Sequence, residues 1–374
     1  MRVTFLMPRY ERGPSGGYRV VCEYANALVS RGHDVTVVHP RRLEPPCPSE
    51  KLSLRGHVRE TLNNLSNVLF TPSIDWQPID DRVKLVHVPS SAPEYIPDAD
   101  AIFATAWGTV PPILECPKTK GEKCYLIQGY ETWQGPKDLV DATWRSPLHK
   151  VVVSKWLCEV GNELGCRDLV YIPNGVDHDR YRLLRPIESR PRQVAMAFST
   201  GSVKGPGDGL RALEIAKEKY PDTRVVMFGT GRRISSIPSW AEYYRNPPQD
   251  FIVSEIYNRS SIFLSSSWSE GFALPPAEAA CCGCAVVASD SGGIRDFIQT
   301  GETGLLSPPK DPVTLAQNLC LLLGNDDLRV KFAKAGHSGM ARLNWERSAD
   351  LLEDFLTRVV ERKALDRHMA QCSN

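Results

Sequence analysis

Two glutamates eight residues apart, Glu270 and Glu278, lie on either side of a loop whose backbone could bind an anion. The loop leads into Pro275 and Pro276, and proline is favoured in the first turn of a helix, where N–H groups lack partners. The residues that would present their N–H groups are Gly271, Phe272, Ala273 and Leu274. Free N–H groups and the positive end of a helix dipole bind phosphate, whereas carboxylates accept hydrogen bonds from hydroxyls. The pattern suits a ligand with hydroxyls at both ends of a diphosphate, such as a nucleotide sugar.

The elements around this loop are typical of a parallel sheet. Ser261 to Leu264 is an apolar run that predicts a strand, Ala277 to Cys282 continues the helix, and Ala285 to Ala288 predicts the next strand. Ser291-Gly292-Gly293 then opens a second helix. Strands that alternate with helices form parallel sheets, and ligands bind at the carboxyl ends of such strands. We therefore expect two helix N-termini to converge on one anion site.

The same stretch resembles the donor-binding signature of family 4 retaining glycosyltransferases. The residues that match the family pattern in order are Glu270, Gly271, Phe272, Leu274, Pro275, Glu278, Ala279, Gly283, Val286, Val287, Ala288, Gly292 and Gly293. The last position of the pattern is Asp296, where the family has Glu. Asp296 could instead be a capping carboxylate in a helical first turn.

The resemblance implies an α/β protein of the GT-B fold: two Rossmann-like, doubly wound domains that face a central cleft, with a C-terminal helix that crosses back to the N-terminal domain. Asn174-Gly175-Val176-Asp177 resembles the family's interdomain signature, and the polar, proline-containing stretch Arg182 to Arg192 predicts a linker. We expect an acceptor-side domain over residues 1–185, a nucleotide-sugar domain over 190–345 and the returning helix over 346–374. A chain of 374 residues is long enough for two such cores.

The resemblance also implies roles for donor-side residues. Lys204 and Gly205 match the family's Lys-Gly pair, so Lys204 would stabilise the leaving phosphate. Ser199 stands where the family commonly has Arg, and Arg232 or Arg233 could replace that cation. Glu270 would hold hydroxyls of the donor sugar and, with Lys204, form the catalytic pair. Glu278 would hold the ribose.

In the N-terminal half, Gly16 and Gly17 follow a strand at Arg2 to Pro8 and precede a helix at Tyr18 to Ser30. In the family an early Gly-Gly faces the donor diphosphate, although a tight turn without a ligand would use the same residues. The predicted acceptor-side residues, any of whose aromatic rings could equally be core, are Trp107, Tyr130 and Glu131. Many members have a histidine near the end of the strand at Ala101 to Thr105, where this chain has Ala106-Trp107-Gly108.

Composition excludes several classes of protein. A formal net charge of +1 argues against nucleic acid as a partner. No apolar run approaches the roughly 20 residues of a membrane-spanning helix, and Met1 to Met7 has no signal-peptide layout. Eleven cysteines, an odd number, then indicate reduced thiols and a cytoplasmic protein. The basic, leucine-containing stretch Arg41 to Phe70 could be a solvated insertion, or could touch an acceptor or an anionic membrane surface as a peripheral contact.

We expect no metal and no other cofactor. Cys281, Cys282 and Cys284 occupy positions where the family has small packing residues, and Asp98 and Asp100 fit a turn. The implied reaction moves a sugar from a nucleotide diphosphate to an acceptor hydroxyl with retention at the anomeric carbon. A glycan, a lipid-linked intermediate and a small molecule all remain open as the acceptor.

Three alternatives stay open on the sequence. A dinucleotide oxidoreductase would use the same type of sheet, but Gly229-Thr230-Gly231 lacks the third glycine of the fingerprint. A nucleotide-sugar epimerase of similar architecture would need no acceptor. A non-catalytic binding protein on the same fold would explain Ser199, Asp296 and the missing histidine.

Overall fold

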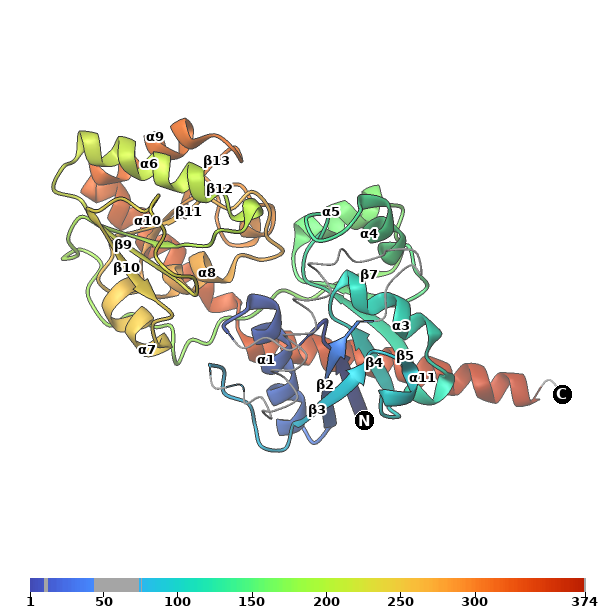
Figure 1. The fold of residues 1–374 in the computed structure, drawn as a ribbon. Helices are drawn as coiled ribbons and strands as arrows, with labels where there is room; N and C mark the ends of the chain where they lie inside the picture. Colours follow the sequence, from blue (N-terminus) through green and yellow to red (C-terminus); the bar gives the residue numbers. More distant parts are fainter. Residues whose placement is uncertain (10–12, 44–73, 75, 373–374) are drawn as a thin grey trace. The chain divides into compact units, whose positions relative to one another are not determined.

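The computed structural model describes residues 1–9, 13–43, 74 and 76–372 and contains two compact units (Figure 1). The first unit comprises Met1–Val152, Val160–Ile172 and Ser348–Asn374, and the second comprises Val153–Glu159 and Pro173–Arg347. Each unit is built around one parallel sheet with its own core, as the predicted fold class requires.

Within the described residues, the first unit has a seven-stranded sheet in the order β3-β2-β1-β4-β5-β6-β7. Its strands are β1 (Arg2–Leu6), β2 (Asp34–Arg42), β3 (Lys84–Ser90), β4 (Ala101–Ala104), β5 (Glu122–Ile127), β6 (His149–Val152) and β7 (Leu169–Tyr171). The helices that follow them along the chain are α1 (Gly16–Ser30), α3 (Val110–Glu115), α4 (Lys137–Trp144) and α5 (Lys155–Glu163), of which α5 belongs to the second unit as far as Glu159. The central strands are continuous apolar runs because helices cover both faces of a parallel sheet.

The C-terminal helix α11 (Trp345–Cys372) packs on the first unit and runs alongside its sheet in Figure 1. The Phe355 ring lies 6.2 Å from the ring of Phe103 in β4. His33 Nε2 lies 2.8 Å from Glu353 Oε1, and Arg31 pairs with Asp350. Apolar packing and these polar contacts confirm the predicted return of the last helix to the N-terminal domain.

The second unit has a six-stranded sheet, in the described part of the chain, with the order β10-β9-β8-β11-β12-β13. Its strands are β8 (Gln193–Ala197), β9 (Arg224–Gly229), β10 (Ala241–Arg245), β11 (Ile262–Ser265), β12 (Ala285–Ser289) and β13 (Gly304–Ser307). Its helices are α6 (Pro206–Lys219), α7 (Gln249–Phe251), the π-helix Ile252–Tyr257, α8 (Leu274–Cys281), α9 (Pro312–Leu323) and α10 (Asp326–Gly339).

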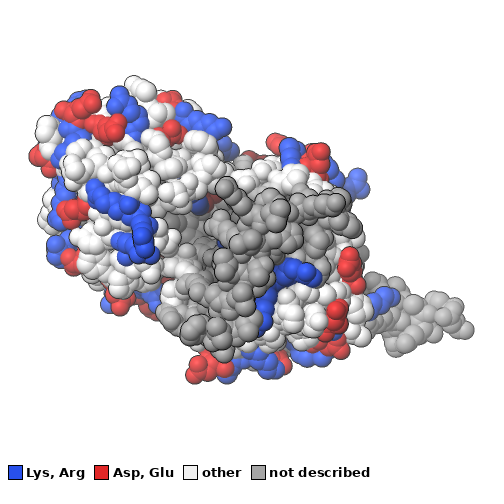
Figure 2. Space-filling model, in the orientation of Figure 1, with Lys and Arg blue, Asp and Glu red and all other residues white. Residues whose placement is uncertain are grey.

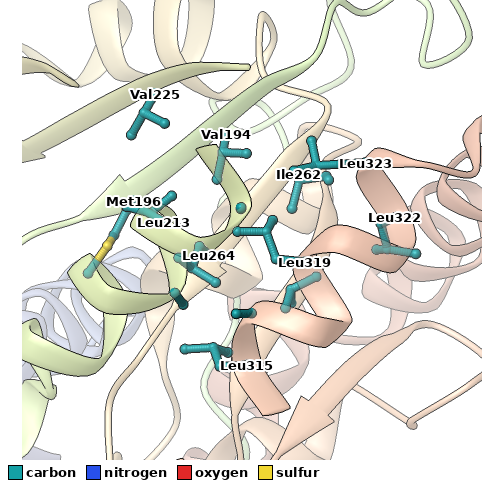
Figure 3. Close-up of a cluster of buried hydrophobic side chains, with 14 of the residues drawn as sticks. Val194, Met196, Leu213, Val225, Ile262, Leu264, Leu315, Leu319, Leu322 and Leu323 are labelled. Carbon is teal, nitrogen blue, oxygen red and sulfur yellow. The ribbon is translucent and has the colours of Figure 1, made fainter. Parts of the chain in front are cut away.

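One apolar cluster holds the second unit together (Figure 3). Met196 of β8 and Leu264 of β11 meet Leu213 of α6, while Leu315 and Leu319 come from α9. All five are at most 1% exposed. Burying side chains of this size stabilises the fold by roughly 1.5–3 kcal/mol each, so the strand ends that carry the site loops rest on a rigid layer.

The structure differs from the sequence-based expectation at three places. The interdomain signature belongs to the second unit rather than to residues 1–185, because Val176 N–H donates to Leu343 O at 3.0 Å. Ala241–Arg245 is a strand that the sequence did not indicate. The segment after Gly292 forms only a short 3-10 turn, Gly293–Asp296.

The expectation for Arg41 to Phe70 falls mostly on residues 44–70, which lie outside the described part of the chain. On the face shown in Figure 2, acidic and basic side chains are interspersed over the described surface, in keeping with the net charge of +1. Among the helices described, none has the length and apolar character needed to span a bilayer.

Candidate functional site

The donor-side residues gather where the strand order of the second sheet reverses. β8 pairs with β9 on one side and with β11 on the other, so the connections leave this point in opposite directions. The loop after β8 carries Lys204, and the loop after β11 carries Glu270. Such a switch point leaves a crevice outside the carboxyl ends of the strands, which is where ligands bind in open α/β sheets.

The loop before α8 presents unpaired backbone donors. Within the described residues, no hydrogen bond is formed by the backbone N–H groups of Gly271, Phe272, Ala273 and Leu274. Pro275 and Pro276 follow as the second and third residues of α8, and Ala273 adopts a left-handed conformation with φ 75°. Phe272 and Ala273 are only 3% and 5% exposed, and their N–H groups are available to bind a ligand.

The Gly292-Gly293 turn supports this loop, whereas the sequence predicted a second helix whose N-terminus would bind the anion. Gly293 N–H donates to Glu270 O at 3.2 Å, and Glu270 N–H donates to Ser291 O at 2.9 Å. A Cβ on Gly293 would lie 2.2 Å from Gly271 O, so only glycine fits. The two turns are therefore locked together, with the free N–H groups on the Gly271 to Leu274 side.

The catalytic pair proposed from the sequence is in direct contact. Lys204 Nζ lies 2.7 Å from Glu270 Oε1 and 2.8 Å from Oε2. The Glu270 side chain is 18% exposed and that of Lys204 is 42% exposed, so the pair is accessible to a ligand. The cation and the carboxylate that the sequence predicted as a pair therefore neutralise each other.

Three contacts between the two loops place Lys204 there. Gly205 has φ 55°, and a Cβ on it would lie 2.2 Å from Ser266 O, so the turn after Lys204 requires glycine. Ser266 Oγ donates to Lys204 O at 3.1 Å, and Trp268 N–H donates to Val203 O at 2.7 Å. The loop after β8 is thereby fixed to the loop after β11.

Glu278 is buried one turn into α8, with 5% exposure. The hydroxyl of Tyr257 donates to Glu278 Oε2 at 3.1 Å. Tyr257 comes from the end of the π-helix and is itself fully buried. Burial raises the pKa of Tyr257 well above its ordinary value, so the hydroxyl keeps its proton and acts as a donor to the carboxylate.

The structure distinguishes the two arginines that could replace the missing phosphate ligand. Arg233 is committed to the backbone, because its guanidinium donates to Ala241 O at 2.9 Å and to Pro238 O at 2.6 Å. Arg232 is exposed, and no hydrogen bond or ion pair engages it within the described residues. Ser199 is also exposed, and its Oγ accepts the Gly201 N–H at 3.3 Å. Arg232 is thus the available cation on the loop after β9.

Asp296 and the cysteines have structural roles. The Asp296 carboxylate accepts the Lys155 N–H at 3.2 Å, so it caps α5 rather than the turn in which it lies. Burial raises the pKa of Cys281 to about 12 and that of Cys284 to about 11, which keeps both thiols protonated. Among the described residues, no three His, Cys, Asp or Glu side chains are grouped so that they could hold a metal ion.

The Gly-Thr-Gly turn at Gly229 is explained by packing. A Cβ on Gly229 would lie 2.2 Å from Phe198 O, at the end of the neighbouring strand β8. Tyr243 OH donates to Gly231 O at 2.8 Å and closes the turn. The glycine allows two backbones to approach, so the turn is no indication of a dinucleotide site.

In the first unit, the corresponding switch point lies between β1 and β4. Gly16 and Gly17 form the N-terminal turn of α1, and a Cβ on Gly17 would lie 3.5 Å from Gln128 Nε2. Gln128 Nε2 donates to Thr105 O at 3.3 Å, which fixes the orientation of the amide. Its Oε1 is buried and has no hydrogen-bond partner in the described chain.

Gln128 was not singled out by the sequence. The signal is a buried acceptor without a donor, which arises only when the loops after β4 and β5 meet α1. A buried polar atom of this kind is costly unless a ligand supplies its partner, so Gln128 joins the candidate site.

The three predicted acceptor-side residues lie on the loops after β4 and β5. Glu131 Oε2 accepts the Trp107 N–H at 2.7 Å. Burial raises the pKa of Glu131 to about 7, although the Trp107 N–H acts in the opposite direction. Tyr130 is committed elsewhere, because its hydroxyl lies 2.7 Å from Asp141 Oδ1. Glu131 and Trp107 are thus brought together, and Tyr130 belongs to a separate contact.

Two Rossmann-like units, each built on a parallel sheet, define the class of the chain as the GT-B fold. Comparison with known proteins agrees. Residues 184–338 match the family described as glycosyl transferases group 1, and the resemblance predicted from the signature is confirmed. This part of the chain is therefore similar to a family of sugar-transferring enzymes.

Curated relatives carry related names. A phosphatidyl-myo-inositol mannosyltransferase of Mycobacterium tuberculosis is 25% identical over 376 residues, which cover 92% of this chain and 93% of that enzyme. A D-inositol 3-phosphate glycosyltransferase of Corynebacterium jeikeium is 30% identical over 161 residues, which cover 43% of this chain and 35% of that protein.

Solved structures share the fold at low sequence identity. Sucrose-phosphate synthase from Thermosynechococcus elongatus superposes with a TM-score of 0.72 at 14% identity, over 96% of this chain and 99% of the other. Anabaena Alr3699/HepE, solved in complex with UDP-glucose, gives a TM-score of 0.69 at 14% identity, over 96% of this chain and 100% of the other.

Proposed function

We propose that the chain is a retaining glycosyltransferase that moves a sugar from a nucleotide diphosphate to an acceptor hydroxyl without a metal. The observation that carries the proposal is the row of unpaired N–H groups from Gly271 to Leu274, at the switch point of the second sheet. Four donors on one turn can bind the diphosphate, while Glu278 accepts from ribose hydroxyls and Glu270 from sugar hydroxyls.

In the proposed reaction, the bond between the anomeric carbon and the β-phosphate oxygen breaks. A bond from that carbon to the acceptor oxygen forms on the same face, and the acceptor proton passes to the departing phosphate oxygen. Negative charge develops on the phosphate, where Lys204, Arg232 and the N–H groups before α8 would stabilise it. Neither Glu270 nor Glu278 is assigned as a nucleophile.

We assign the acceptor to the first unit. Glu131 and the orphan oxygen of Gln128 are acceptors for hydroxyl hydrogens at the carboxyl ends of β4 and β5. The N-terminus of α1 at Gly16 and Gly17 would add N–H donors for phosphate. The mannosyltransferase and inositol phosphate glycosyltransferase among the relatives are consistent with a polyhydroxylated acceptor.

A thermal-shift panel of UDP, GDP, dTDP and ADP tests the donor assignment. A ligand that binds only the folded state raises the melting temperature by mass action, and about 2.7 kcal/mol is gained at a concentration 100 times Kd. One nucleotide should stand out, and its sugar conjugate should be slowly hydrolysed. If none of the four stabilises the protein, the assignment fails; binding without any turnover would favour the non-catalytic alternative.

The absence of a metal requirement has its own test. Transfer should proceed at an unchanged rate in excess chelator, and the product anomer, read by NMR, should match the donor. Activity that is lost in chelator and restored by a divalent ion would overturn the metal-independent reaction, and an inverted product would overturn retention.

A further inference from the structure

Arg190 is a buried cation in the segment that precedes β8, and it has no carboxylate partner among the described residues. It is 6% exposed, and no ion pair includes it. A buried charge without a counter-ion is costly unless other groups compensate it. The groups that compensate the charge of Arg190, and the elements that carry these groups, therefore indicate its role.

The two Nη groups of the guanidinium donate to carbonyl oxygens at the C-terminal ends of two helices, whereas Nε is buried without a partner in the described chain. Nη1 donates to Tyr257 O at 3.2 Å and to Ser260 O at 3.0 Å, at the end of the π-helix. Nη2 donates to Cys282 O at 2.5 Å, at the end of α8. The last carbonyls of a helix lack internal partners and carry the negative end of the dipole, so one arginine caps both helices.

Those two helices carry the buried pair of the nucleotide side. Tyr257 is the residue whose carbonyl Arg190 binds, and Cys282 follows Glu278 by one helical turn, with Cys282 N–H donating to Glu278 O at 3.1 Å. The Tyr257 hydroxyl in turn donates to the Glu278 carboxylate. Arg190 therefore fixes the spacing of the two backbones between which that hydrogen bond is made.

The surrounding chain is shaped to admit this arginine. Nη2 also donates to Asn258 Oδ1 at 3.2 Å and to Arg185 O at 3.1 Å. Gly283 has φ 83°, and a Cβ on it would lie 3.1 Å from Nη2. Every close neighbour thus accepts from the guanidinium or leaves room for it.

We propose that Arg190 is a positioning residue for Glu278, which it holds in register to accept hydrogen bonds from the ribose of the nucleotide. The inference rests on the proposed function and names a determinant of its nucleotide site. It predicts a ligand-specific effect, because hydroxyl recognition by a carboxylate depends on oxygen positions within about 0.5 Å. Contacts of the diphosphate with the turn at Phe272 do not depend on that register.

The test is a double-mutant cycle of Arg190→Lys with Glu278→Gln. It uses isothermal titration with the nucleoside diphosphate found in the four-nucleotide panel and with its 2′,3′-dideoxy analogue. Arg190→Lys should weaken the diphosphate about tenfold, the loss of one good hydrogen bond. It should leave the dideoxy analogue within twofold and have no further effect in the Glu278→Gln background. Arg192→Lys, an exposed change in the same segment, should alter neither affinity.

Equal weakening of both ligands, or an undiminished effect in the Glu278→Gln background, would show that Arg190 is only a general anchor. If Arg190→Lys does not fold, Arg190→Gln provides the same comparison, since its shorter neutral amide cannot reach both helix ends. Failure of every nucleotide to bind the unaltered protein would instead refute the proposed function itself, so the two failures are distinguishable.

Discussion

Lys204 and Glu270, which we propose to bind different parts of the donor, form an ion pair with each other. Lys204 Nζ contacts both carboxylate oxygens, at 2.7 and 2.8 Å. In the proposed reaction a nucleotide-sugar donor separates the pair, so that its phosphate contacts Lys204 and a sugar hydroxyl contacts Glu270. A nucleoside diphosphate without its sugar recovers only the first of these contacts. Glu270 therefore competes with the bare nucleotide for Lys204.

We predict that Glu270→Gln binds the nucleoside diphosphate more tightly but transfers sugar more slowly. A partly exposed ion pair is worth up to about 1 kcal/mol, so the gain in affinity should reach about fivefold at most. The rate should fall at least tenfold, because a hydrogen bond to a charged group is worth roughly 1.5–3 kcal/mol. Isothermal titration and initial rates measure the two effects. Glu242→Gln, which breaks the exposed pair with Arg224, is the control, and weaker nucleotide binding by Glu270→Gln would contradict the competition.

Glu131 should give the protein a pH-dependent stability. Burial raises the pKa of Glu131 to about 7, whereas an ordinary glutamate titrates near 4.5. Between these values the folded state binds a proton that the unfolded state does not, so this contribution to stability is present at low pH and is lost as pH rises through 7. In Glu131→Gln the group cannot titrate. Melting temperatures of the two proteins are compared from pH 5 to pH 8. As pH rises towards 7, the melting temperature of the unaltered protein should fall relative to that of Glu131→Gln, and above pH 7 the difference should stay constant. A difference that is independent of pH would contradict this.

Site residues that lie close together in the sequence were predictable from the sequence alone. Glu270, Glu278 and the four residues before Pro275 lie in one continuous stretch, and Lys204 stands before a glycine that the turn requires. Gln128 could not be found in this way. Its Oε1 is buried without a partner only because the loops after β4 and β5 meet α1 in the folded unit. The same limit applies to Tyr130, whose hydroxyl is taken by Asp141 on the following helix.

At the scale of elements, each strand that the sequence analysis predicted lies within two residues of a strand in the structure, namely β1, β4, β11 and β12. The strand β10 was not predicted. Its sequence, Ala241–Arg245, has mostly half-buried side chains and lies at the edge of the sheet. An edge strand lacks the continuous apolar signature of a central parallel strand, and Pro247 and Pro248 just beyond it favour a loop. Gly293–Asp296 remains a short 3-10 turn because Phe297, with φ −135°, leaves helical geometry directly after it.

The turn before α8 should be sensitive to one methyl group. A Cβ on Gly293 would lie 2.2 Å from Gly271 O and 2.7 Å from Phe272 N, so Gly293→Ala must displace the row of free N–H groups. We predict that nucleoside diphosphate binding weakens at least tenfold, as expected for the loss of one or more charge-assisted hydrogen bonds. Isothermal titration on protein with an unchanged circular dichroism spectrum measures this. Gly339→Ala, where a Cβ meets nothing within 4 Å, should bind normally; unaltered binding by Gly293→Ala would place the anion elsewhere.

At the scale of the whole molecule, the first unit is built from segments at both ends of the sequence. The chain forms most of the first unit, then the second, and returns to the first through α11. Phe355 of α11 is 3% exposed and packs near Phe103, while Phe332 of α10 is 2% exposed within the core of the second unit. These two phenylalanines lie only 23 residues apart in the sequence (355 minus 332) but stabilise different cores. They form a matched pair for testing how stability is divided.

Each substitution, Phe355→Ala or Phe332→Ala, should destabilise the unit in which the side chain is buried, by about 3–5 kcal/mol. We predict that Phe355→Ala accelerates amide hydrogen exchange in β4 and its neighbours and leaves the nucleoside diphosphate affinity within twofold. Phe332→Ala should accelerate exchange in β8, β11 and β12 instead and should weaken the nucleotide, because the strands that position the donor loops lose their support. Exchange mass spectrometry and titration separate the two patterns. If Phe355→Ala raises exchange mainly in the second sheet, the last helix stabilises the nucleotide-binding unit, and the predicted return to the N-terminal domain is wrong.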